Sequence, residues 1–292
     1  MSPDEKRKDM WEVIMIDLFF RLIYDMPAAI TNNPWKINLP WLAPDSSPLP
    51  EGIGSVVFLT NSKVTLILAR FFAMLDEDVG TDKFELMTKA EGLCREVEAA
   101  VAEWSLVSIP LRVLPCHAKK DSQAVFQFAW LATTSNDGPD TWLVADALLT
   151  GYTSIIHILR KASLHNTSSL STEPPWSQIA GLNLSQFSVA INAARHIING
   201  FKKILVIFPR AECMVALFGA YQCYLPFAIL ANNILGAEDP LEFEEDIKTL
   251  ESFASQAAIL SRGHSDIMPL IHAMQTVNAE IQGTVDDFSG NY

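Results

Sequence analysis

Apolar residues recur at helical spacing along most of the chain. Residues 9–24 give the clearest case, with apolar positions three or four apart, as at Trp11, Ile14 and Leu18. No segment alternates polar and apolar residues as a half-buried strand does. The pattern therefore predicts an all-α fold of about nine helices. Besides 9–24, these helices are expected at about 56–77, 82–106, 122–133, 141–164, 184–208, 211–236, 240–262 and 265–283.

Two polar stretches interrupt this periodicity. Six prolines fall within residues 26–54, which predicts an irregular, mostly extended segment near the N-terminus. Residues 165–183 are rich in Ser, Thr and Pro and are expected to form a mobile loop. This loop could also divide two domains, but the helices after it look too apolar to stand alone. We therefore predict a single large helical domain over 1–292, with a frayed tail at 286–292.

One stretch, residues 213–237, carries no charged side chain and is long enough to cross a bilayer. However, Pro226, Gln222 and two asparagines lie inside it, and no Lys/Arg bias flanks it. A fully buried central helix is the better interpretation, so we predict no membrane span. The charged N-terminus does not read as a signal peptide, which predicts a cytoplasmic protein.

The composition narrows the function classes. Hydrophobic residues make up 49% of the chain and charged residues 19%, which excludes a disordered protein. The net charge of −13 argues against direct nucleic acid binding, because an acidic surface repels phosphate backbones. The four cysteines form no C-x-x-C pair and no His lies at metal-ligand spacing from them, so no metal site is predicted. No nucleotide, flavin or hydrolase motif is present either, and no cofactor is expected.

Several polar and aromatic residues lie inside apolar helices, where they are candidates for lining a mostly apolar ligand pocket. His157 and Tyr224 are the candidate catalytic donors, because either could polarise a substrate carbonyl. For every candidate, a hydrogen-bonded core residue is the structural alternative. Asp17 and Arg21 are four residues apart in one helix and are expected to form a structural ion pair. The candidate substrate-binding residues are Tyr221, Trp130, Tyr152, His196 and Asp146.

The N-terminal part of the chain has a Trp-containing helix with an Asp, then a Pro-containing turn, then an extended segment ending in Leu-Pro. The residues that form this pattern are Trp11, Asp17, Pro27, Leu39 and Pro40. In type and order they resemble the middle homology (regulatory) domain of fungal zinc-cluster transcription factors. The later helices, through 211–236, resemble the family's C-terminal half.

The chain also departs from this family pattern. Glu12 stands where the family has a second Trp, and Leu18 rather than Arg follows Asp17. The six-cysteine DNA-binding cluster, the basic linker and the coiled coil are absent from the sequence. If these 292 residues are the full-length protein, the resemblance implies a helical regulatory domain without its own DNA reader. A truncated gene model is the alternative, and it would favour a regulator.

Two functions follow from these observations. The first is a hydrophobic small-molecule-binding protein of fungal secondary metabolism. Most directly it would be a cofactor-independent cyclase or isomerase, for example for a Diels–Alder-type cyclisation of a terpenoid or polyketide intermediate, because such catalysis needs chiefly orientation. The alternative is a nuclear transcriptional regulator or co-regulator that acts through another DNA-bound chain. We favour the first, since a pocket keeps a use without a DNA reader. The expected partner is an apolar small molecule, and homodimerisation is left open.

Overall fold

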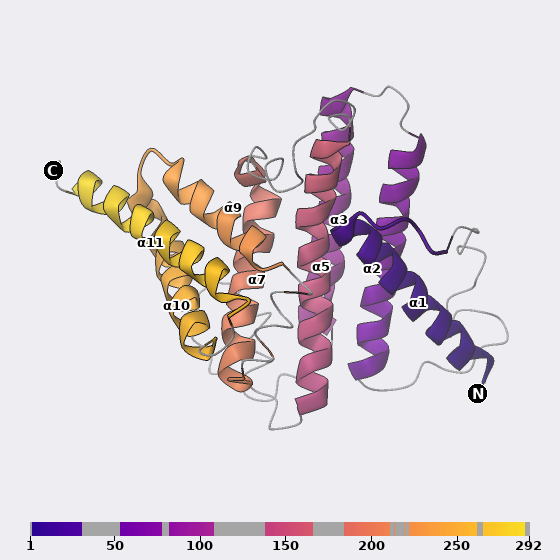
Figure 1. The fold of residues 1–292 in the computed structure, drawn as a ribbon. Coiled ribbons are helices and arrows are strands. Elements are labelled where there is room, and N and C mark those ends of the chain that lie inside the picture. Colours follow the sequence, from indigo (N-terminus) through magenta and orange to yellow (C-terminus); the bar gives the residue numbers. More distant parts are fainter. Residues whose placement is uncertain are drawn as a thin grey trace. The chain divides into compact units, whose positions relative to one another are not determined.

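The computed structural model describes residues 2–30, 53–77, 82–107, 138–165, 184–210, 213, 219, 222–261 and 265–289. Within these ranges the regular elements are eight α-helices and two short 3-10 helices, and there is no strand (Figure 1). The predicted all-α class is therefore confirmed, with a helix count close to the predicted nine.

The chain forms two compact units, and each is described by itself. The first unit contains α1 (Pro3–Tyr24), α2 (Ile53–Glu77), α3 (Lys83–Val107) and α5 (Gly138–Leu164). The second contains η2 (Leu184–Gln186), α7 (Ser188–Ile207), α9 (Tyr224–Leu235), η3 (Pro240–Phe243), α10 (Glu244–Leu260) and α11 (Met268–Ser289). The prediction of one domain over 1–292 stays a prediction.

Helix α1 begins earlier than its apolar pattern indicates. The Ser2 side chain accepts a hydrogen bond from the Glu5 N–H at 3.2 Å, and the Glu5 carboxylate accepts one from the Ser2 N–H, which makes a capping box. Pro3 occupies the first turn, where its missing N–H has no cost. The face that bears Trp11 and Leu22 is buried, and α1 packs on α2 and α5.

Helices α3 and α5 pack against each other in the first unit. A Cβ placed on Gly151 would come within 2.4 Å of Val101 Cγ2, so a larger residue here would force Val101 or the helices to shift. Nearby, the Cys94 thiol lies 3.5 Å from the Ile155 carbonyl oxygen. Burial raises the pKa of Cys94, which keeps the thiol protonated and unreactive.

The second unit has an apolar interior, and an ion pair joins two of its helices. The rings of Phe201 on α7 and Phe253 on α10 stack with their centroids 6.2 Å apart, and both side chains are buried. Three acidic residues, including Asp246, fall in the first turn of α10, where the helix dipole favours them. Arg195 of α7 binds Asp246 and so fixes α7 against α10.

Several predicted boundaries can now be compared with the structure. The helices predicted at 56–77 and 82–106 agree closely with α2 and α3. The frayed tail is wrong as far as Ser289, since α11 continues to that residue and the Ser289 hydroxyl donates to the Val285 carbonyl at 2.9 Å. The predicted helix at 122–133 lies outside the described residues. So do most of the irregular segment 26–54 and all but the first residue of the loop 165–183.

Two described helices meet the length and composition of a membrane span. These are α2 and residues 142–164 of α5, and 67% and 83% of their most apolar windows are buried inside the structure. Core helices also meet these criteria, so the observation is weak evidence. In the stretch 213–237, the described helix is α9, which has 12 residues.

Candidate functional site

A line of buried polar side chains runs along α5 in the first unit. Thr153, His157 and Arg160 follow one another at i, i+4 and i+7, which places them within about 60° of each other around the helix axis. Their exposed fractions are 1%, 1% and 8%. Thr150 and Ser154 border the same line, and the Ser154 hydroxyl donates to the Thr150 carbonyl at 2.7 Å. Buried polar groups in native proteins ordinarily have hydrogen-bond partners.

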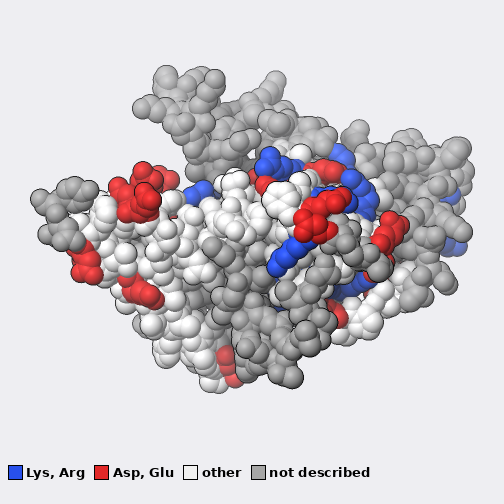
Figure 2. Space-filling view, turned by 90° about the horizontal axis from the view of Figure 1, so that it is seen from above, with Lys and Arg blue, Asp and Glu red and all other residues white. Residues whose placement is uncertain are grey.

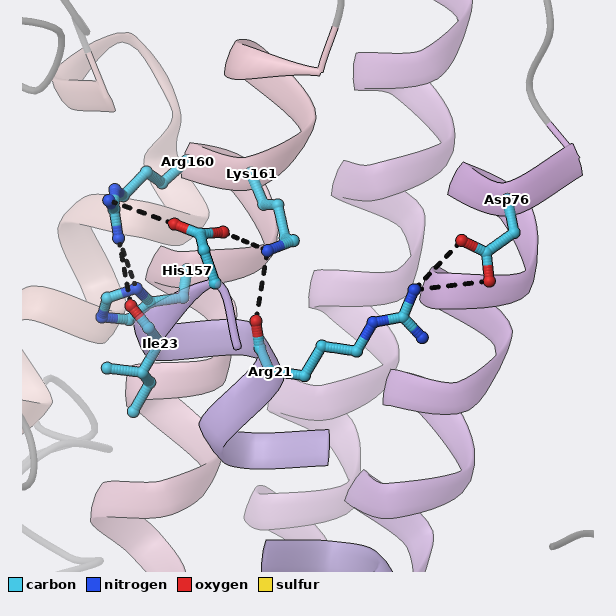
Figure 3. Close-up of polar contacts among 7 residues, drawn as sticks. Arg21, Ile23, Asp76, His157, Arg160 and Lys161 are labelled. Atoms are coloured by element: carbon cyan, nitrogen blue, oxygen red, sulfur yellow. Dashed lines mark hydrogen bonds and ion pairs between the residues drawn. The ribbon is translucent and has the colours of Figure 1, made fainter. Parts of the chain in front are cut away.

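Arg160 is the most connected member of the line (Figure 3). Its Nη1 donates to the Ile23 carbonyl oxygen of α1 at 3.5 Å and to His157 Nδ1 at 3.3 Å. Its Nη2 lies 3.9 Å from Asp25 Oδ2, at the distant limit of an ion pair. One guanidinium therefore links the end of α1 to the interior of α5.

His157 is held in its neutral form. Because an arginine can only donate, Nδ1 of His157 must accept, which leaves its ring hydrogen on Nε2. Burial, and to a smaller extent the charges of Arg160 and Lys161, lower the pKa of His157 to about 3. At neutral pH the imidazole can donate one hydrogen bond from Nε2, but it does not act as an imidazolium acid.

The C-terminal end of α1 is fixed by cations from α5. Lys161 Nζ donates to the Arg21 carbonyl oxygen at 3.1 Å and also pairs with the Asp25 carboxylate. Asp25 caps α1 in the left-handed conformation, with φ of 54°. Lysine and arginine at a helix C-terminus satisfy its last carbonyls and complement its dipole. Part of this cluster is therefore structural.

The predicted Asp17–Arg21 pair is replaced by two other contacts. Arg21 Nη2 reaches Asp76 of α2 at 3.0 Å, and its guanidinium lies 4.0 Å from the centre of the Phe72 ring. Asp17 instead accepts from the backbone N–H groups of Ala29 and Ile30, at 2.9 and 3.3 Å. The chain that follows α1 turns back across Asp17, so this carboxylate organises the turn instead.

Within the part of the chain that the structure describes, two polar atoms of this line have no hydrogen-bond partner. They are the Thr153 hydroxyl oxygen and Arg160 Nε. Asn61 Oδ1 on α2, in the same unit, is a third buried atom of this kind. Most buried polar atoms in native proteins are paired, so each of these calls for a physical explanation. The line on α5 thus keeps unused capacity to donate and to accept.

The second unit provides an internal standard for arginine. Arg195 binds Asp246 through the edge formed by its Nε and Nη2, with Nε–O distances of 2.9 and 3.0 Å and an Nη2–Oδ2 distance of 2.8 Å. This is the two-donor geometry that a planar carboxylate prefers. The same edge of Arg160 has an unpartnered Nε and only the distant Asp25 at Nη2.

Two more of the predicted substrate-binding residues belong to α5. Asp146 lies on the same face as Thr153, two turns before it, where its side chain is exposed. Tyr152 is fully buried, and its position on the helix turns it about 140° away from His157. The structure therefore places Asp146 and His157 on one face and Tyr152 on another.

The other predicted residues belong elsewhere. His196 is half-buried on α7, where burial and then the charge of Arg195 lower its pKa to about 4. Tyr224 opens α9 and its hydroxyl donates to Gln222 Oε1 at 3.1 Å. Tyr221 and Trp130 lie outside the described residues. The predicted donors His157 and Tyr224 thus belong to different compact units and do not form one site within either.

The sequence prediction missed Thr153 and Arg160 as site residues. A signal exists for Thr153, because polar residues recur at i, i+3, i+4 and i+7 from Thr150 to His157 within an otherwise apolar segment. The described residues include no group of three or more His, Cys, Asp or Glu side chains arranged to hold a metal ion. On the face drawn in Figure 2, most Lys and Arg side chains lie beside Asp and Glu rather than in a separate basic patch.

Comparisons with known proteins add no identity to this site. No family model, no curated protein and no solved structure matches the chain. The resemblance to the regulatory domain of fungal zinc-cluster factors therefore stays a prediction, and the site is interpreted from its own chemistry.

Proposed function

We propose that this chain is a small-molecule-binding protein whose ligand is largely apolar and carries a few polar groups. The observation that carries the proposal is the buried line on α5, where the Thr153 hydroxyl and Arg160 Nε have no partner among the described residues. A mostly apolar surround with a few convergent polar groups is typical of small-molecule sites. Ordered water is the competing explanation, because it also satisfies buried polar atoms.

The cyclase hypothesis is the more specific form of this proposal. His157 would contribute through its Nε2–H, as a neutral donor to a substrate carbonyl. Orientation of a flexible terpenoid or polyketide intermediate would supply the rest of the rate enhancement. The alternative is a regulator that acts through another DNA-bound chain and either senses a metabolite without converting it or contacts transcriptional partners. Asp17, one of the residues that match the regulatory-domain pattern, organises the turn after α1.

Native mass spectrometry of the recombinant chain, before and after exposure to a hydrophobic metabolite extract of a fungal host, tests the proposal. We expect a bound mass of terpenoid or polyketide size, together with a raised melting temperature. Incubation with the precursor of that ligand then separates the hypotheses, since an enzyme converts it and a sensor only binds it. The absence of both a bound mass and a thermal shift would refute small-molecule binding.

A further inference from the structure

The buried arginine of the first unit has an unused carboxylate-binding edge. In the second unit, the Nε and Nη2 of Arg195 hold Asp246 with contacts of 2.8 to 3.0 Å. Arg160 presents the same two donors, but its Nε has no partner among the described residues, and the nearest carboxylate oxygen is 3.9 Å from Nη2. The chain therefore shows, at Arg195, which chemical group completes such an edge.

The pairing of acids and bases around Arg160 also points to a carboxylate. Arg21 has Asp76 as its acid, and Lys161 has Asp25. Arg160 is left as the third cation, sharing Asp25 at a distance, although its side chain is only 10% exposed. Buried charges in proteins are ordinarily paired with an opposite charge at hydrogen-bond distance. A carboxylate from outside the chain would supply that charge.

The surroundings define the rest of the ligand. Arg160 lies near the end of α5, beside the exposed Asp25, so an anionic head group could reach it from the rim of the unit. The line continues inward from Arg160 to Thr153, about 10 Å along the helix axis, between buried isoleucine and leucine side chains. A charged head at the rim and an apolar body inside describe an amphipathic acid.

We infer that the Nε–Nη2 edge of Arg160 binds the carboxylate of an otherwise apolar carboxylic acid, whose body lies along the α5 face towards Thr153. This inference rests on the proposed function and specifies its ligand class. A guanidinium fork suits a planar carboxylate because both donors lie in one plane.

Binding of two matched probes tests the inference directly. Dodecanoate and methyl dodecanoate, both used below micellar concentrations, differ in the charge of the head group and share the apolar body. Isothermal titration calorimetry on the whole chain should show dodecanoate binding at least about tenfold more tightly, as expected for charge-assisted hydrogen bonds. Equal or tighter binding of the ester would overturn the inference and leave small-molecule binding in place.

A variant pair adds residue specificity. Arg160→Lys keeps the positive charge and removes the two-donor edge, so the tenfold preference for dodecanoate should fall to about twofold or less. Arg70→Lys is the control, because this guanidinium lies on α2, is 60% exposed and pairs with Glu96. An unchanged preference in Arg160→Lys would overturn the assignment. Should that variant not fold, the comparison of acid and ester on the unmodified chain still decides.

The two failures are distinguishable. If neither probe binds, and the only compound bound from the metabolite extract is uncharged, the carboxylate inference fails and the proposed function stands. If neither probe nor extract binds, both fail. A carboxylic acid recovered from the extract, whose methyl ester binds at least about tenfold more weakly, would support both.

Discussion

The two compact units differ in how one arginine of each is paired with a carboxylate: Arg195, whose side chain is 35% exposed, and the buried Arg160. In the second unit, Arg195 is completed within the protein by Asp246, which is 8% exposed and accepts from both donors of one guanidinium edge. In the first unit, Arg160 is more deeply buried, and yet its Nε has no partner among the described residues. The ion pair of the second unit contributes to folding, whereas the incomplete arginine of the first is better explained by binding.

The largest expected difference between the units is the loss of stability when the carboxylate beside each arginine is removed. Asp246→Asn should lower the free energy of unfolding by about 2 to 3 kcal/mol, because it leaves Arg195 without its charge partner. Asp25→Asn should cost no more than about 1 kcal/mol, since Asp25 is 61% exposed and lies 3.9 Å from Arg160. Urea denaturation of both variants measures the two values. Equal losses would mean that the pairs of Asp25 with Lys161 and Arg160 together stabilise the chain as much as the Arg195–Asp246 pair does.

Acid provides the next largest effect. An unfolded histidine titrates near 6.5, whereas the pKa of His157 in the folded chain is about 3. The unfolded state therefore binds a proton first as the pH falls, so the stability that His157 contributes is complete above pH 6.5 and is lost between 6.5 and 3. By pH 5 this loss should reach about 2 kcal/mol.

His157→Gln is the variant that isolates this loss, because a glutamine oxygen can still accept from Arg160. Between pH 8 and pH 5 the variant should lose about 2 kcal/mol less stability than the unmodified chain. His196 of the second unit contributes in the same direction, with a pKa of about 4, and should continue to do so in the variant. Parallel stability curves for the two chains over this range would contradict the buried, neutral state of His157.

Substitution of two glycines tests how closely α3 and α5 pack in the first unit. Gly151→Ala should lower the free energy of unfolding by about 1 to 2 kcal/mol, because its Cβ would meet the stiff side chain of Val101 at 2.4 Å. Gly92→Ala on α3, where a Cβ meets nothing within 4 Å, should raise it by up to about 1 kcal/mol through helix propensity. Thermal unfolding distinguishes them, and a gain in both would show that the contact of α3 with α5 is looser than described.

The helices themselves were largely predictable, since burial of one helix face leaves a periodic record in the sequence. Agreement is close for α2 and α3, whose apolar faces run to their ends. The start of α1 was missed because its first turns are charged and are held by the Ser2–Glu5 capping box, which an apolar pattern does not record.

The site was predictable only in part. Sequence spacing identifies neighbours on one helix, and this gave Asp17 as the partner of Arg21, whereas the partner in the structure is Asp76, 55 residues away. His157 was identified as a polar residue in an apolar helix. Arg160 was not, because the sequence does not reveal that a charged residue near a helix end is buried or that its partner is incomplete. Those properties arise only when α1 packs against α5.

The smallest expected effect addresses the unpartnered hydroxyl. Thr153 and Thr65 are both 1% exposed in the first unit, but only the Thr65 hydroxyl donates, to the Asn61 carbonyl at 2.7 Å. Thr153→Val removes a buried polar atom that has no described partner, so it should be about 1 kcal/mol more favourable for stability than Thr65→Val. If a ligand's polar group meets that hydroxyl, Thr153→Val should also weaken ligand binding while it stabilises the free protein, and Thr65→Val should leave binding unchanged. Chemical denaturation and calorimetry on the same two variants measure both quantities.

A gain of stability in Thr153→Val without a loss of binding would place the ligand away from Thr153. A loss of stability in Thr153→Val would show that the hydroxyl already has a hydrogen-bond partner in the free protein, such as an ordered water.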